Sequence, residues 1–72
     1  MPKLYHVFAL DIWEQSPLEH IGSMLVTAET PEEAEQKAMK EFEETFEDYQ
    51  ILPAAYEVTN VDGYRIQLVK ES

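Results

Sequence analysis

The feature that most constrains this chain is a single well-marked helix. Residues 30–33, Thr-Pro-Glu-Glu, match a capped helix start, because the threonine oxygen can accept the amide of the second glutamate. Proline at the first helical position loses no needed hydrogen bond. Apolar residues then recur at spacings of four, four, four and three: Ala34, Ala38, Phe42, Phe46 and Tyr49. This stripe predicts a helix over residues 31–48 that covers one surface only, and Pro53 prevents it from continuing far.

Acidic residues crowd the same helix. Eight of the chain's fifteen Asp and Glu residues fall between Glu32 and Asp48, and the net charge is −10. Near the end of the helix, where its dipole favours cations, stand five acids that we call the acidic helix end: Glu41, Glu43, Glu44, Glu47 and Asp48. Like charges four residues apart oppose helix formation, and a surface that lowers local stability is a candidate for a function. We therefore predict that this surface binds a protein partner with a basic surface. The alternative is a solvated face that only maintains solubility.

The first third of the chain predicts an antiparallel hairpin of two strands. Residues 4–13 are rich in aromatic and branched side chains, and residues 20–28 form a second such run. The connection between them is short and polar, with Ser16-Pro17 as a turn signal. Both faces of the first run are apolar, which suits a strand with little exposure to water.

The last third predicts a second hairpin around Asp62-Gly63. A two-residue loop would pair Val61 with Tyr64, whereas a three-residue loop pairs Asn60 with Tyr64. The second register gathers five apolar side chains on one face: Tyr56, Val58, Tyr64, Ile66 and Leu68. Because a one-residue slip is costly when a face is buried, we predict the three-residue loop, with Gly63 in the left-handed conformation.

The order of elements predicts an α+β fold of the ββαββ type, as one small domain over residues 1–72. The helix should pack on one face of a four-stranded, mainly antiparallel sheet. We expect Tyr5, Val7 and Trp13 on the opposite face, where an exposed apolar patch would join two copies or dock a partner. The alternative places these residues at sheet edges, covered by the loop around Leu18.

Composition argues against several classes of function. The chain has no cysteine, only two glycines, and only His6 and His20 as histidines, so no zinc site or phosphate cradle is indicated. No catalytic motif is present, and we expect neither enzymatic activity nor a cofactor. A net charge of −10 disfavours direct binding to nucleic acid or membrane. Without a secretory signal or a long apolar run, the expected location is the cytoplasm of the producing or host cell.

One segment carries a family resemblance. Residues 26–34, Val-Thr-Ala-Glu-Thr-Pro-Glu-Glu-Ala, end a strand in Val-x-Ala and start a capped Glu-Glu-Ala helix. This pattern resembles the DpnD/PcfM-like family of small proteins from phages, plasmids and other mobile elements. The resemblance runs from the second strand into the helix and transfers no functional residue. It implies a small accessory protein of a mobile element.

Two functions fit these observations. The first is a non-enzymatic acidic binding module, an inhibitor or nucleic-acid mimic whose acidic helix end occupies a basic surface of a host or defence protein. The second is a small homodimeric accessory protein that associates through its open sheet face, with acidity serving only solubility.

Overall fold

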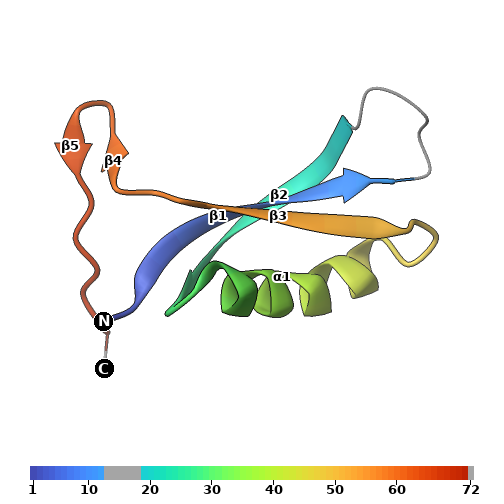
Figure 1. The fold of residues 1–72 in the computed structure, drawn as a ribbon, viewed down its shortest axis with the longest axis horizontal. Helices are drawn as coiled ribbons and strands as arrows, with labels where there is room; N and C mark the ends of the chain where they lie inside the picture. The colour runs from blue at the N-terminus through green and yellow to red at the C-terminus, as the bar shows by residue number, and fades with distance from the viewer. Residues whose placement is uncertain (13–18, 72) are drawn as a thin grey trace.

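The computed structural model describes residues 1–12 and 19–71, with only the backbone described at positions 19 and 20. In chain order the elements are β1 (Lys3–Asp11), β2 (Glu19–Ala28), α1 (Pro31–Thr45), β3 (Ile51–Glu57), β4 (Asn60–Val61) and β5 (Tyr64–Arg65). Figure 1 shows α1 against one face of the sheet formed by β1, β2 and β3, with β4 and β5 standing apart at one end. The predicted α+β class is confirmed, but a three-stranded sheet and a separate hairpin replace the four-stranded sheet.

β1 is the central strand of the sheet. The strand order is β2-β1-β3, and both pairings are antiparallel, which confirms the first hairpin. A strand flanked on both sides and covered on one face suits the apolar character of residues 4–10. β3 tolerates Pro53 because an edge strand needs hydrogen bonds on one side only.

The helix starts where the sequence predicts and ends earlier. The Glu33 amide donates to the Thr30 hydroxyl oxygen at 3.1 Å, and Pro31 is the first helical residue, so the predicted cap is confirmed. The helix ends at Thr45 because Phe46 leaves helical geometry, with φ −117° and ψ 51°. The Tyr49 amide then donates to the Phe46 carbonyl at 3.0 Å. This turn redirects the chain into β3, so the predicted end near residue 48 is wrong.

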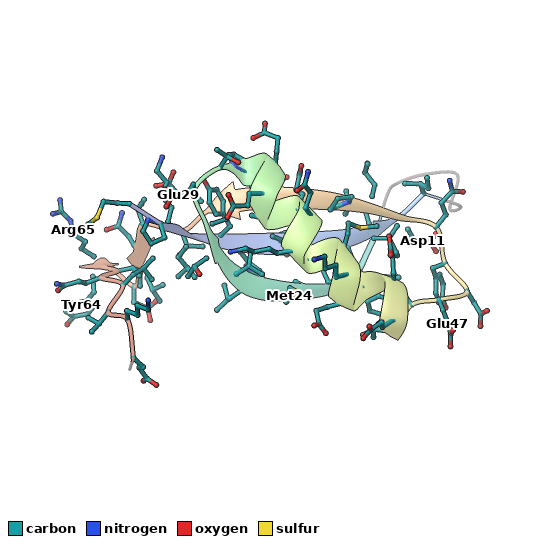
Figure 2. All side chains as sticks on the ribbon, turned by 90° about the horizontal axis from the view of Figure 1, so that it is seen from below. Asp11, Met24, Glu29, Glu47, Tyr64 and Arg65 are labelled. Carbon is teal, nitrogen blue, oxygen red and sulfur yellow. The ribbon has the colours of Figure 1, made fainter. Side chains whose placement is uncertain are left out.

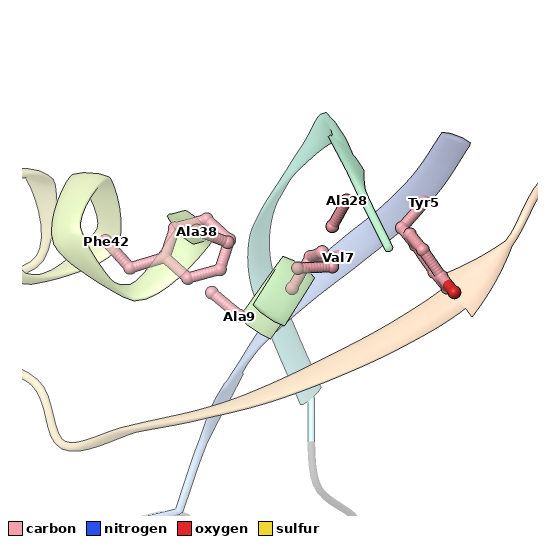
Figure 3. Close-up of a cluster of buried hydrophobic side chains, with 7 residues drawn as sticks. Tyr5, Val7, Ala9, Ala28, Ala38 and Phe42 are labelled. Atoms are coloured by element: carbon pink, nitrogen blue, oxygen red, sulfur yellow. The ribbon is translucent and has the colours of Figure 1, made fainter. Parts of the chain in front are cut away.

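The core lies between the sheet and α1. Its buried side chains, most of them labelled in Figure 3, are Tyr5, Val7, Ala9, Ala28, Ala34, Ala38 and Phe42. The two helix alanines allow a close approach to the sheet. Gly22, opposite Ala9 in the ladder, leaves room for Phe46: a Cβ added there would lie 2.7 Å from the Phe46 Cζ. Small residues in β1 and β2 therefore form the hollow that the end of the helix fills.

The second hairpin differs from the prediction in register. Val61 pairs with Tyr64 and Asn60 with Arg65, so the loop has two residues. Asp62 and Gly63 have φ of 53° and 85°, as a type I′ turn requires. The predicted left-handed Gly63 is confirmed, and the three-residue loop is wrong. The predicted register relied on the burial of one apolar face, but Tyr64, a member of that face, is 77% exposed. With no burial to decide the register, the turn geometry decides it.

Candidate functional site

The two faces of β1 are exchanged relative to our prediction. Tyr5 is 2% exposed and Val7 0%, because both point into the core under α1. The expectation that they lie on the open sheet face is therefore wrong, and Trp13 lies outside the described residues. The physical reason is steric: the face bearing Ala9 and Gly22 has the hollow that admits the helix, whereas the other face of β1 bears the bulkier Phe8.

The described side chains on the surface opposite α1 include no carboxylate, lysine or arginine. Pairing within the sheet places ten described side chains there, and we call them the open sheet face: Leu4, His6, Phe8, Leu10, Ser23, Leu25, Thr27, Leu52, Ala54 and Tyr56. None of these ten is a carboxylate, lysine or arginine, although the chain's net charge is −10. Leu25 and Tyr56 are each 61% exposed. Most of this surface is apolar and faces water in a single copy.

An aromatic cluster occupies the middle of the open sheet face. The rings of His6 and Phe8 lie 4.3 Å apart between centroids, and the Tyr56 ring meets Phe8 edge-on at 5.7 Å. Phe8, Leu10, Ala54 and Tyr56 line a shallow depression of about 440 Å³. The cluster spans the β1–β3 pair, so strand pairing fixes the positions of its side chains before any partner arrives.

The acidic helix end is exposed, as the sequence predicts. All five of its carboxylate residues are exposed, and none forms an ion pair with another described residue. α1 has no basic residue in its last turn. The described ion pairs lie elsewhere: one joins Lys37 to Glu33, one joins Lys3 to Glu57, and one joins the N-terminal amine to Glu29. The negative charge of this surface is therefore available to a partner.

Two of these acids border a hollow that is lined partly by aromatic residues. Glu43 and Glu47, with Phe46, Tyr49 and other residues of the helix-to-β3 turn, line a depression of about 280 Å³. The Tyr49 ring meets the Phe46 ring edge-on at 6.2 Å. Carboxylates beside aromatic rings suit a lysine or arginine side chain from a partner.

Sequence reasoning missed the members of the open sheet face on the edge strands. Leu25, Leu52 and Tyr56 become neighbours of β1 only through the β2-β1-β3 order, which the sequence did not reveal. β3 offered no alternation signal, because Ile51, Pro53 and Ala55 on its other face are also apolar. The predicted second hairpin included Tyr56.

Comparisons with known proteins add no assignment. No family model matches this chain, and no curated protein or solved structure matches it. Among residues 1–12 and 19–71, no three His, Cys, Asp or Glu residues gather as a metal ion would require. No described helix is long and apolar enough to cross a membrane. The resemblance to DpnD/PcfM-like proteins stays a prediction.

Proposed function

We propose that this chain is a non-enzymatic interaction module that pairs with a second copy of itself through the open sheet face. One observation carries the proposal: none of the ten described outward side chains on three strands is a carboxylate, lysine or arginine, in a chain of net charge −10. Contiguous exposed apolar patches often mark association surfaces. Each square ångström of apolar surface removed from water contributes about 25 cal/mol.

A second copy suits this surface because the face is chemically complementary to itself. Apolar side chains would meet apolar side chains, and no carboxylate, lysine or arginine of this face would lose its hydration. Two sheets packed face to face lie about 10 Å apart. The helices then form the outer layers, and their acids stay separated by more than the Debye length of about 8 Å. Repulsion between two copies of net charge −10 is therefore weakest in this arrangement.

Sedimentation equilibrium of matched lysine variants tests the proposal. Wild-type mass should rise with concentration from 8.4 kDa towards twice that value. Leu25→Lys places a charge in the open sheet face and should weaken association by at least about tenfold, a loss of roughly 1.4 kcal/mol. Gln36→Lys adds the same charge at an exposed position of α1 and should leave the dimer intact. A monomer at every concentration would exclude the homodimer.

A second candidate function rests on the acidic helix end. Its five exposed and unpaired acids, two of them beside the aromatic hollow, support docking to a basic surface of another protein. Such an acidic module would act as an inhibitor or mimic by occupying a positive groove, with charge steering accelerating the encounter. The resemblance to mobile-element proteins makes a host or defence protein the natural partner for this function.

Salt and charge reversal distinguish this second function from the first. A partner captured from host lysate through the acidic helix end should be lost at about 0.5 M salt, where screening shortens the range of these charges. It should also be lost with Glu43→Lys/Glu47→Lys but retained with Glu32→Lys/Glu71→Lys, which changes the net charge equally. Capture that persists through both changes would reduce the acids to a solubility feature.

A further inference from the structure

The open sheet face alone is small for a stable dimer. Three strands spaced about 4.8 Å apart, rising about 3.3 Å per residue, give a flat area of roughly 350 Å². A partner in a stable complex usually contributes about 800 Å² of accessible surface. Side chains that project from the sheet enlarge the area of the open sheet face, but it stays well below the area that a partner usually contributes. A homodimer through this face therefore needs contacts from another part of the chain.

Residues 58–71, which we call the C-terminal arm, offer those contacts. The arm contains the β4–β5 hairpin, and neither strand lies close to another described helix or strand. Tyr64 is 77% exposed and Val69 76%. Figure 1 shows the hairpin rising beyond the end of β3, on the side of the sheet opposite α1. The hairpin therefore stands beyond one end of the sheet, on the side of the open sheet face, and its Val61 and Tyr64 are exposed apolar residues.

Charge is distributed unevenly along the molecule. Residues 1–57 hold thirteen acids and three bases and so carry the entire net charge of −10, whereas the arm holds two of each. Arg65 and Lys70, the bases of the arm, form no ion pair with any described residue. Figure 2 shows Arg65 and Tyr64 at one end of the molecule and Glu47 with Asp11 at the other. The neutral, cation-bearing arm and the acidic helix end thus lie at opposite ends of the molecule.

We propose that two copies pack face to face with their β1 strands antiparallel, so that each arm lies against the far end of the other copy's sheet. This inference rests on the homodimer proposed above and supplies its orientation and its missing contact area. At that far end Asp11 pairs with Ile51, and the acidic helix end lies nearby. The arm of one copy would bury Tyr64 there and bring Arg65 towards the other copy's excess negative charge.

The parallel orientation is disfavoured by the same charges. If the β1 strands ran in the same direction, the two acidic helix ends would lie at the same end of the dimer, on its two outer layers. The two arms would meet at the other end, so neither acidic helix end would gain a nearby cation from the other copy. The antiparallel orientation instead places each acidic end beside a segment without net charge, which lowers the repulsion between the copies.

Cysteine cross-linking tests the orientation, because the natural chain contains no cysteine. Tyr64→Cys reports from the arm and Gln50→Cys from the far end of the sheet. Under mild oxidation, a mixture of the two variants should give several-fold more mixed disulfide than a mixture of Tyr64→Cys with Gln36→Cys. Gln36 is an exposed position on α1, away from the proposed interface. Val61→Cys, which keeps the tyrosine, serves as a second reporter from the arm.

The outcomes separate this inference from the homodimer itself. A disulfide that forms preferentially between the Tyr64→Cys and Gln50→Cys variants supports the antiparallel dimer. A disulfide that forms preferentially between two Tyr64→Cys chains means that the arms meet, and it overturns the orientation. No preference over the Gln36→Cys control, in a sample that sedimentation shows to be dimeric, overturns the role of the arm and leaves the proposed function standing. A monomeric sample overturns both.

Discussion

The two faces of β1 are nearly equal in apolar content and differ entirely in their surroundings. Val7 points into the core under α1, whereas Phe8, the next residue, lies on the open sheet face. The difference lies in the neighbours, because Ala9 and Gly22 leave a hollow on one side that no small residue of β1 matches on the other. The sequence thus shows that both faces of β1 are apolar, and local side-chain volume decides which face packs against the helix.

The largest expected effect comes from placing a charge on each face in turn. Val7→Asp buries an unpaired carboxylate in the core and should cost about 4 kcal/mol or more, comparable to the whole stability of a small domain. Phe8→Asp exposes its charge on the open sheet face and should leave a folded monomer. Circular dichroism and urea denaturation at low concentration measure both. Similar losses from the two variants would show that the faces do not differ as described.

A smaller effect tests why the helix packs on the face of the sheet that bears Gly22. Gly22→Ala forces the half-buried Phe46 ring to move, because the new Cβ would lie 2.7 Å from the ring's Cζ atom. We expect a loss of about 1 kcal/mol, at the low end for overpacking, because the ring can swing outwards. Adding Phe46→Leu should recover part of this loss. An unchanged denaturation midpoint for Gly22→Ala alone would argue against this contact.

A third variant sharpens the contrast between the open sheet face and the core. Leu25→Ser removes an exposed apolar side chain, so the free energy of unfolding of the monomer should change by about 0.5 kcal/mol or less. Dimer dissociation should nevertheless become several-fold more favourable. Parallel measurements of urea denaturation at low concentration and of sedimentation at high concentration check this. A large loss of monomer stability would place Leu25 in the core instead.

The smallest expected effect concerns the C-terminal arm. Gly63→Val introduces a branched side chain at a φ of 85° and strains the turn. Because β4 and β5 do not pack on another element, the melting temperature of the monomer should stay close to that of the wild type. Differential scanning calorimetry at low concentration measures this. A clear drop would mean that the arm supports the core.

The sequence was sufficient for features set within a few neighbouring residues. The Thr30 cap, the helix start at Pro31, the first hairpin and the left-handed Gly63 depend on local chemistry and were predicted correctly. The exposure of the acidic helix end was also foreseeable, since clustered carboxylates are almost never buried unpaired.

Features set by distant residues were not predictable in the same way. The face of β1 that holds Tyr5 and Val7 depends on packing between elements that are remote in sequence. The second hairpin register was decided by turn geometry, because burial expected at Tyr64 did not exist. The open sheet face itself required the strand order, which brings Leu25 and Tyr56 to opposite sides of β1.

The most direct test of the central claim is an isotope-filtered nuclear Overhauser experiment on a mixture of labelled and unlabelled protein. Such spectra report only contacts between different copies of the chain. The homodimer predicts intermolecular contacts between the aromatic protons of Phe8 or Tyr56 and the methyl groups of Leu25 or Leu52. Intermolecular contacts confined to α1, or none at concentrations where the sample should be dimeric, would contradict it.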